Sequence, residues 1–363
     1  MKSLNFIDLF SGCGGFSYGL EQAGHRCLLG VDFDPAAIDS FAANHPQAVA
    51  AHMDIHKLSS KKLNDMIDVS LVDMVVGGPP CQGFSTVGKG LAQDERNSLF
   101  KQFVRIVKLT QPKVIIFENV TGLVAKKNEK TLSHIFKSFE RLGFNLEAQV
   151  LSAEGYGVPS RRRRTIIMGV KAGSPVFPRR SSRTMTVADA FRRLDRSKRT
   201  VLNHDLDSAK INNELDIKRL KHIPPGRGIR YQRDELELLP KSLRYDISWE
   251  ELRENRFRQT RLQRIPLNQP APTILTSKSM YYHPTDHRYL TAREAAMLQS
   301  FPLSFEFKGS VTSQFRQIGN AVPPKLAFAL GKSIYKIGDT TTEAQRLLER
   351  QKVAAQAFNY KAS

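Results

Sequence analysis

Residues 72–83 read VDMVVGGPPCQG, an apolar run that passes directly into a turn rich in glycine and proline and carrying one thiol, Cys81. Short apolar runs bounded by such turns are typical of buried strands. A second apolar run, residues 114–117, is followed at once by Glu118. In open α/β sheets, ligands bind outside the carboxyl ends of the strands. The sequence therefore predicts a candidate nucleophile, Cys81, and a candidate acid, Glu118, at the ends of two strands.

The pattern around this stretch predicts an α/β fold. Apolar runs at 6–10, 27–31, 72–76, 114–117 and 166–170 read as strands, and helical spacing separates several of them, at 35–44 and 98–109. Strands that alternate with helices indicate βαβ units and a parallel sheet. From about residue 173 to 300, prolines and arginines interrupt the periodicity, which indicates a second, loop-rich domain. Helices are expected again over 291–299, with Thr291 as cap and Glu294 three residues on, and over 324–336. A fraying polar helix is expected in the tail, 340–363.

Composition narrows the class of protein. The 363 residues are 40% hydrophobic, enough for a core, and the formal net charge is +20. Residues 171–264 hold 23 Lys and Arg against 13 Asp and Glu, half of that surplus. Dense positive charge favours a nucleic acid partner, because binding releases condensed counterions. Three cysteines without CxxC spacing suit a reducing cytoplasm. No apolar run approaches the roughly 20 residues that span a bilayer, so we expect a cytoplasmic protein without membrane association.

Residues 6–16 read as a strand, a glycine turn and the start of a helix. Gly12, Gly14 and Gly15 would let a ligand approach the backbone, although an ordinary tight turn explains the glycines equally well. Ser17 stands where a dinucleotide fingerprint has its third glycine. Asp32 lies 20 residues after Gly12, where an acid can bind ribose hydroxyls.

Two further positions fit a nucleoside. Phe33 could stack on an adenine or belong to the core, and Asp54 could accept from an adenine amino group, although an exposed loop aspartate explains it better. No phosphate-binding Lys follows the glycines, so a nucleoside without a polyphosphate fits best. S-adenosylmethionine is such a molecule.

Five blocks of sequence, in this order, resemble the DNA (cytosine-5) methyltransferase family of the bacterial restriction-modification type. The resemblance covers the chain except for the middle of the basic domain and the tail. Ser160 replaces a glutamine usual in the family, and Met297 stands where the family commonly has arginine. The blocks are Asp8-Leu9-Phe10-Ser11-Gly12-Cys13-Gly14-Gly15, Gly78-Pro79-Pro80-Cys81-Gln82-Gly83-Phe84-Ser85, Glu118-Asn119-Val120, Arg162-Arg163-Arg164 and Gln317-Ile318-Gly319-Asn320-Ala321-Val322-Pro323-Pro324.

The resemblance implies a Rossmann-like, S-adenosylmethionine-dependent methyltransferase sheet with a smaller target-recognition domain. Residues 1–172 would form the catalytic and cofactor-binding domain, 173–300 the target-recognition domain, and 301–363 a return segment that completes the first domain. It also implies a monomer that acts on double-stranded DNA, accompanied by a separate cognate restriction endonuclease.

The resemblance also assigns roles. The thiolate of Cys81 would add to C6 of cytosine, Glu118 would bind or protonate N3, Arg164 would stabilise O2, and Arg162 would support the site or bind phosphate. Residues 83–97 would close over a flipped-out base, with Val87 or Ser85 filling the vacated space. No metal is expected. The cofactor contacts would be Phe10, Ser11, Gly12, Gly14, Gly15, Asp32, Phe33, Asp54, Ile55, Pro80, Asn320 and Ala321.

Three other functions remain open at this point. A tRNA cytosine-5 methyltransferase shares these blocks but typically carries a Cys-Phe-Thr segment later in the chain, and no cysteine follows Cys81 here. A DNA-binding protein could keep the fold without catalysis, although the intact Cys81 and Glu118 disfavour that. A nicotinamide-dependent oxidoreductase is disfavoured by Ser17 and by the basic charge.

Overall fold

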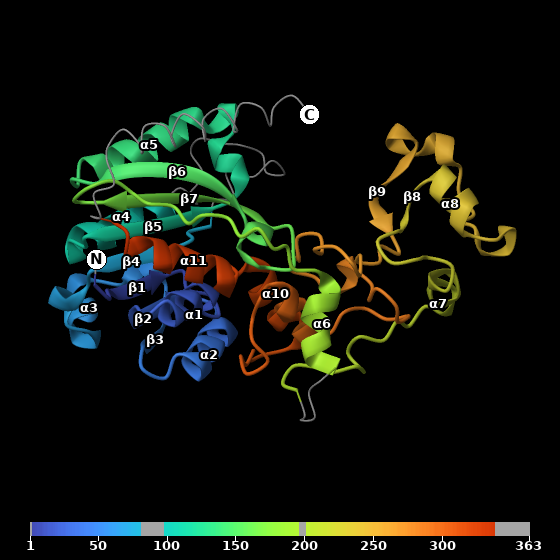
Figure 1. Ribbon diagram of the computed structural model, residues 1–363, viewed down its shortest axis with the longest axis horizontal. Helices are drawn as coiled ribbons and strands as arrows, with labels where there is room; N and C mark the ends of the chain where they lie inside the picture. The colour runs from blue at the N-terminus through green and yellow to red at the C-terminus, as the bar shows by residue number, and fades with distance from the viewer. Residues whose placement is uncertain (1, 81–97, 196–200, 338–363) are drawn as a thin grey trace.

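The computed structural model describes residues 2–80, 98–195 and 201–337 of the chain (Figure 1). Cys81, the loop 83–97 with Ser85 and Val87, and the predicted tail helix therefore lie outside the described residues. Seven strands within the described ranges form one sheet, in the order β3-β2-β1-β4-β5-β7-β6. They are β1 (Asn5–Leu9), β2 (Arg26–Asp32), β3 (Val49–His52), β4 (Met74–Gly77), β5 (Val114–Asn119), β6 (Asn145–Ser152) and β7 (Arg163–Val170).

The sheet is mixed, which corrects the prediction of a parallel sheet. Strands β1 to β5 pair in parallel, but β7 runs antiparallel to both β5 and β6. Parallel neighbours need a long crossover, whereas β6 and β7 are joined by the short connection 153–162, which favours antiparallel pairing. Strand β6 was not predicted, because Glu147 and Gln149 break its apolar run and its residues are mostly half-buried.

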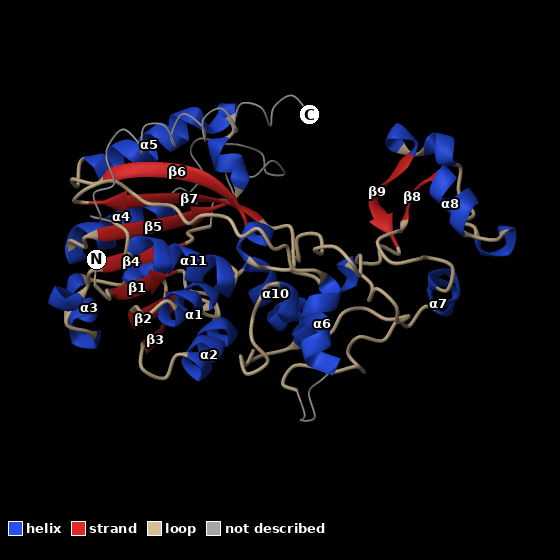
Figure 2. Cartoon of the chain, viewed as in Figure 1, coloured by secondary structure: helices blue, strands red, loops and turns tan. Residues whose placement is uncertain are grey.

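Helices cover both faces of this sheet (Figure 2). On one face α1 (Gly15–Gln22), α2 (Pro35–Asn44) and α11 (Pro324–Ile334) pack on alternate strand residues such as Phe6 and Ile116. On the other, α3 (Ser60–Met66), α4 (Ser98–Thr110) and α5 (Glu129–Glu140) pack on the residues between them, such as Ile7 and Ile115. Burial on both faces explains why the central strands read as continuous apolar runs rather than as an alternation.

Helix α11 brings the late part of the chain back to the first helix. A Cβ atom at Gly19 of α1 would lie 2.2 Å from the carbonyl oxygen of Pro324, so a side chain there would force the two helices apart. The helix predicted over 324–336 is therefore confirmed, and it places the preceding turn beside the glycine loop that follows β1.

The middle of the chain is basic and consists of short helices and strands joined by loops. The strands β8 and β9 form a two-stranded antiparallel ribbon, at the end of the molecule far from the sheet (Figure 1). This ribbon has its own small hydrophobic cluster, which includes Trp249 and Phe257. The elements are α6 (Val187–Asp195), α7 (Glu214–Leu220), β8 (Ile229–Tyr231), α8 (Gln232–Leu238), β9 (Arg256–Arg261), α9 (Ala292–Leu298) and α10 (Val311–Asn320).

The predicted helix after Thr291 is confirmed as α9, with Thr291 and Glu294 forming the expected capping box. Phe191 and Leu290 share a hydrophobic cluster with Phe301 and Ile318, which links residues on both sides of the boundary predicted at residue 300. The domain limits themselves stay predictions. Within the described part of the chain, every helix is too short or too polar to cross a membrane.

Candidate active site

The strand order places a ligand crevice between β1 and β4. From β1 the chain continues toward β2 and β3 on one side, whereas β4 leads to β5 on the other side. In open α/β sheets such a reversal leaves a crevice at the carboxyl ends of the two strands. The glycine loop that follows β1 and the segment Gly78 to Pro80 that follows β4 therefore meet at this edge of the sheet. Two of the predicted blocks lie there.

The glycine loop is held by Asp32 at the end of β2. Oδ2 of Asp32 accepts a hydrogen bond from the N–H of Gly12 at 2.8 Å, and Oδ1 accepts one from the N–H of Asp34 at 2.9 Å. Burial raises the pKa of Asp32, and these hydrogen bonds oppose that rise. Gly12 and Gly14 have positive φ angles, +53° and +90°, which non-glycine residues rarely adopt. Asp32 thus fixes the turn through which a ligand would approach.

Two side chains at this edge are left open to a ligand. The Oγ of Ser11 is buried and has no hydrogen-bond partner among the described residues. The ring of Phe33 is 72% exposed, so the core interpretation of Phe33 is excluded. A buried hydroxyl without a partner is costly, and a large exposed aromatic ring is unusual unless it meets a ligand. Both features fit a nucleoside that lies over the carboxyl end of β2.

The remaining predicted cofactor residues differ in their surroundings. Asp54 is exposed and caps the short 3-10 helix η1 (Ile55–Lys57), with Oδ1 accepting from the N–H of His56 at 2.9 Å. The side chain of Ile55 is buried in the core, so only its backbone could touch a ligand. Phe10 has a positive φ of 61° and is half-buried. Pro80 is exposed and is the last described residue before Cys81.

Glu118 and Arg164 meet at the end of β5. Glu118 is 9% exposed, and the Nε of Arg164 lies 2.8 Å from its Oε1. The orientation of this ion pair is not that of a hydrogen bond, so Oε1 has no hydrogen-bond partner in the described part of the chain. A Cβ atom at Gly78 would lie 2.7 Å from Oε2 of the same carboxyl. The carboxyl group is therefore enclosed between the loop after β4 and the start of β7, with one oxygen available to a donor.

Neighbouring backbone fixes the loop that leads to Cys81. The side-chain amide of Asn119 donates to the carbonyl oxygen of Pro79 at 3.2 Å, and its carbonyl oxygen accepts from the N–H of Val120 at 2.9 Å. The end of β5 and the segment after β4 are thus joined directly. Pro80 is the last described residue of this segment, and Cys81, which follows it in the sequence, lies outside the described residues.

Arg162 is buried and holds the return segment. Its Nη1 donates to the carbonyl oxygen of Gly319 at 2.7 Å and its Nη2 to that of Asn320 at 2.9 Å, with the residue only 1% exposed. Burial, together with the positive charge of Arg164, lowers the pKa of Arg162 to about 9, so Arg162 remains charged at neutral pH. Such bonds favour a supporting role for Arg162 over contact with a phosphate.

The segment held by Arg162 lies against the glycine loop. A Cβ atom at Gly15 would lie 2.6 Å from the carbonyl oxygen of Val322 and 3.3 Å from the Cβ of Ala321. The side chain of Asn320 is exposed, and Ala321 is half-buried. Residues 320 and 321, which were predicted only from the resemblance, therefore lie beside the start of α1.

Sequence reasoning missed the role of Asp8 in this loop. The Oγ of Ser17 donates to Oδ2 of Asp8 at 2.6 Å, and burial raises the pKa of Asp8 to about 7. Ser17, which looked like a defect in the fingerprint, is thus the partner of a buried carboxyl under the glycine turn. In the sequence, this contact is indicated only by a polar residue in an otherwise apolar strand, Asp8, and by a hydroxyl nine positions later, Ser17.

Comparison with known proteins agrees with this geometry. The model of the C-5 cytosine-specific DNA methylase family matches residues 4–336. The type II methyltransferase M1.HphI of Haemophilus parahaemolyticus is 39% identical to this chain, over 92% of this chain and 87% of its own length. The type II methyltransferase M.DdeI of Desulfomicrobium norvegicum is 31% identical over 96% of this chain and 94% of its own length.

Solved structures show the same fold. A candidate DNA modification methyltransferase encoded within a prophage in E. coli is 25% identical, with a TM-score of 0.70, over 93% of this chain and all of that one. The S. pombe Dnmt2 methyltransferase is 19% identical, with a TM-score of 0.55, over 90% of this chain and 96% of that one.

The family model spans most of the chain, and the relatives match over most of their own length. The predicted family and the predicted Rossmann-like α/β fold are confirmed. The chain therefore belongs to the C-5 cytosine-specific DNA methylase family and is a DNA (cytosine-5-)-methyltransferase.

Proposed function

We propose that this enzyme transfers a methyl group from S-adenosylmethionine to C5 of a cytosine flipped out of a specific duplex sequence, through a covalent bond between Cys81 and C6. The observation that supports this most is the carboxyl of Glu118, which is buried and paired with Arg164, and whose Oε1 has no hydrogen-bond partner among the described residues. Such a group suits a ring nitrogen that gains electron density during the reaction.

The residues around the glycine loop fit S-adenosylmethionine. Ser11 offers a buried hydroxyl without a partner among the described residues, Phe33 an exposed ring for the adenine, and Asp32 a carboxyl at the end of β2 for the ribose. Asn320 and Ala321 would close the pocket from the return segment. Bound there, the cofactor supplies an electrophilic methyl group on a sulfonium centre. Enzymes of this family generally use S-adenosylmethionine.

The protein groups then act on the cytosine ring. The thiolate of Cys81 forms a bond to C6, and the electron pair of the C5–C6 double bond moves toward C5, N3 and O2. Glu118 donates a hydrogen bond or a proton at N3, and Arg164 stabilises the charge on O2. After methylation at C5, a base such as water takes the C5 proton, which restores the C5–C6 double bond and expels the thiolate of Cys81. N3 then returns any proton it received to Glu118. This sequence needs no oxidant and no metal.

The substrate must leave the helix to reach this site. A cytosine inside a duplex is stacked on its neighbours, and extruding it costs a few kcal/mol. We propose that the loop 83–97 and the basic middle of the chain bind the duplex, and that the free energy of this binding offsets the free energy of extruding the base. A separate restriction endonuclease of the same specificity would accompany the enzyme, as the naming of its relatives as type II methyltransferases suggests.

The experiment replaces Cys81 and uses a trapped substrate. The enzyme is incubated with S-adenosylmethionine and duplexes that contain 5-fluorocytosine, in which the C5 proton needed for release is absent. We expect a covalent protein–DNA adduct with the natural chain and none with Cys81→Ala, which should still bind the duplex. Methyl transfer by Cys81→Ala would refute the covalent mechanism, and adducts on RNA alone would refute the duplex DNA substrate.

A further inference from the structure

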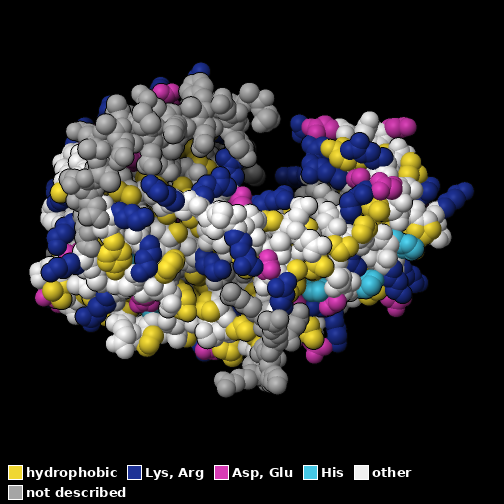
Figure 3. All heavy atoms as spheres, in the orientation of Figure 1, with side chains coloured by type: hydrophobic (Ala, Val, Ile, Leu, Met, Phe, Trp, Pro, Cys, Tyr) yellow, Lys and Arg dark blue, Asp and Glu magenta, His cyan; other side chains and the backbone are white. Residues whose placement is uncertain are grey.

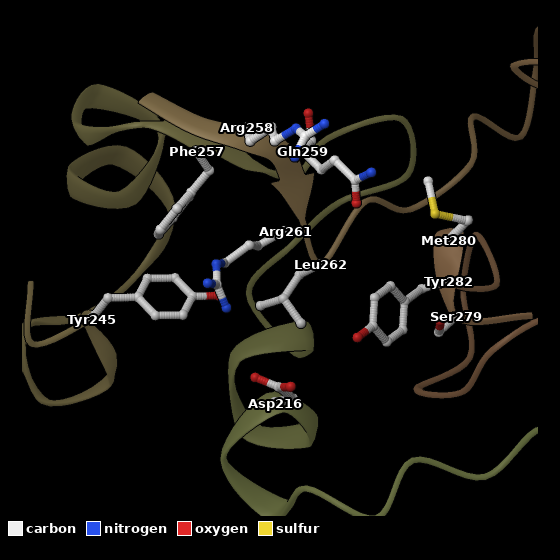
Figure 4. Close-up of a pocket in the computed structure, with 11 residues that line it drawn as sticks. Asp216, Tyr245, Phe257, Arg258, Gln259, Arg261, Leu262, Ser279, Met280 and Tyr282 are labelled. Carbon is white, nitrogen blue, oxygen red and sulfur yellow. The ribbon is translucent and has the colours of Figure 1, made fainter. Parts of the chain in front are cut away.

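A cavity of about 580 Å³ lies in the β8–β9 part of the chain (Figure 4). The strand β9 forms one wall with Arg258, Gln259 and Arg261, while Asp216 of α7 lies at its base. The space-filling view shows a hollow between this part of the molecule and the part that carries the sheet, with Lys and Arg side chains along its wall (Figure 3).

Most arginines near the cavity are already engaged. Arg227 pairs with Glu237 at 2.8 Å, Arg256 pairs with Glu254, and Arg264 donates to the carbonyl oxygens of three residues. These guanidinium groups hold the loops of this region together and have few donors left for a ligand.

Arg258, Gln259 and Arg261 differ from them. All three are exposed, and within the described residues none of their side chains makes a hydrogen bond or an ion pair. Figure 4 shows Arg258 and Gln259 side by side at the top of the cavity and Arg261 pointing toward Tyr245. The three side chains thus offer unused donors and an unused amide oxygen to the cavity that they line.

Arg261 is oriented in advance by aromatic rings. Its guanidinium lies 4.5 Å from the ring centre of Phe257 and 5.5 Å from that of Tyr245. Buried Glu235 orders their surroundings, because it accepts from the backbone N–H of Tyr245 at 2.5 Å and from the indole N–H of Trp249 at 2.8 Å. The Trp249 ring in turn packs against Phe257, with 4.7 Å between the ring centres. A guanidinium held against a ring loses less entropy when its edge binds a partner.

We propose that Arg258, Gln259 and Arg261 determine the recognition sequence by reading base edges in the major groove, the two arginines at guanines and Gln259 at an adenine. This inference rests on the proposed duplex DNA substrate. A two-stranded ribbon fits the major groove, where guanine presents two acceptors to a guanidinium and adenine presents an acceptor and a donor to an amide. Asp216 in the same cavity already pairs with Arg219 at 3.5 Å. The unused groups of the cavity are therefore two guanidinium groups and an amide that can both donate and accept, a mixture that favours base edges over the DNA backbone.

The test uses the full chain and a library of random duplexes that each contain one cytosine to be scored. One pool is sequenced after retention on the protein, and a second after methylation and bisulfite conversion. The variants are Arg258→Ala, Gln259→Ala and Arg261→Ala, with Arg258→Lys to keep the charge. Arg256→Ala is the matched control, because it removes an arginine from the same strand that is already paired with Glu254.

We expect each arginine variant to relax a guanine preference at one position by about tenfold or more, and Gln259→Ala to relax an adenine preference similarly. Arg258→Lys should relax the same position as Arg258→Ala, and Arg256→Ala should keep the natural preference. Uniform weakening on all sequences, or unchanged preferences in the retained pool, would overturn the inference. Altered preferences in the retained pool without any methylated cytosine would instead refute only the proposed reaction.

Discussion

Arg164 reaches Glu118 because β7 runs antiparallel to β5. In the register of these strands Glu118 lies opposite Ile166, two residues from Arg164 and on the same side of β7. An antiparallel strand begins where its neighbour ends, so the first residues of β7 lie at the carboxyl end of β5. The Nε of Arg164 is 2.8 Å from Oε1 of Glu118 as a result. A parallel strand in this place would carry its first residues to the opposite edge of the sheet.

Glu118→Gln should remove most of the activity and leave the fold intact. An amide keeps the shape of the side chain but cannot donate a proton to N3, and general acid catalysis contributes about 10²–10⁴-fold. We therefore expect the single-turnover rate of methylation to fall by about that factor while duplex binding persists. Glu140→Gln, at the exposed end of α5, is the control and should change neither quantity. A rate within twofold of the natural enzyme would argue against an acid role for Glu118.

Gly78→Ala should act on the same carboxyl from the other side. The added methyl group would lie 2.7 Å from Oε2 of Glu118, so the flexible carboxyl must move while the backbone need not. We expect a loss of about tenfold to a hundredfold in the methylation rate, because small displacements of a reacting group are costly. The free energy of unfolding should change by less than about 1 kcal/mol.

A double-variant cycle checks the origin of that effect. In the Glu118→Gln background, Gly78→Ala should add little further loss, because the group that it displaces has already been disabled. Full additivity of the two losses would mean that Gly78 matters for another reason, such as the path of the loop toward Cys81.

The sequence allowed prediction of those site residues whose position depends only on the local segment of chain around them. Apolar runs bounded by turns located β1, β2, β4 and β5, the end of one of these runs selected Glu118, and the resemblance selected Arg164. The contacts between segments were not predictable in this way. Nothing in the sequence around Arg162 says that its guanidinium bonds the carbonyl oxygens of Gly319 and Asn320, because that contact joins residues 157 and 158 positions apart.

Burial was equally hard to predict at single positions. Phe33 and Ile55 were both named as cofactor contacts, yet the ring of Phe33 is 72% exposed and the side chain of Ile55 is 5% exposed. The two residues follow strands in similar positions, and only the packing of α3 and α4 distinguishes them. Local sequence records the hydrophobicity of a residue, not which helix later covers it.

Phe33→Ala should weaken binding of S-adenosylmethionine without destabilising the protein. Stacking of a base on an aromatic ring contributes about 1–3 kcal/mol, so the Kd measured by calorimetry should rise about tenfold. The ring is already exposed, so thermal unfolding should hardly change. Phe328→Ala, which removes a 39% exposed ring from α11, is the control and should leave the Kd unchanged. An unaltered Kd in Phe33→Ala would place the adenine elsewhere.

Arg162→Lys tests whether this buried arginine is a positioning residue. A lysine keeps the charge but cannot serve both carbonyl oxygens with a planar fork, so one buried acceptor loses its bond. The free energy of unfolding should fall by about 1–3 kcal/mol. The Kd for S-adenosylmethionine should also rise, because Asn320 and Ala321 lose their anchor beside Gly15.

The control for Arg162 is Arg141→Lys, an exposed arginine at the end of α5. It should change neither the stability nor the Kd. A weakened duplex affinity in Arg162→Lys with unchanged stability would instead point to a phosphate contact.

Asp8→Asn should change how stability depends on pH. The folded protein holds the proton of Asp8 up to a pKa of about 7, while the unfolded chain releases it near the ordinary value of 3.8. Unfolding therefore releases a proton between these values, and the contribution of Asp8 to stability falls as pH rises through this window. Asparagine has no proton to release. The free energy of unfolding of the variant should therefore rise relative to that of the natural chain between pH 4 and 7, by at most about 4 kcal/mol.

Chemical denaturation at pH 4.5 and pH 8 measures this gain, with Asp65→Asn on the exposed surface of α3 as the control. The difference in unfolding free energy between Asp8→Asn and the natural chain should grow in favour of the variant from the lower to the higher pH. A difference that stays constant across the range would mean that Asp8 is ionised in the folded protein at both values. The Ser17 hydroxyl would then donate to a full negative charge beneath the glycine loop, and removing that charge should loosen the loop and weaken cofactor binding.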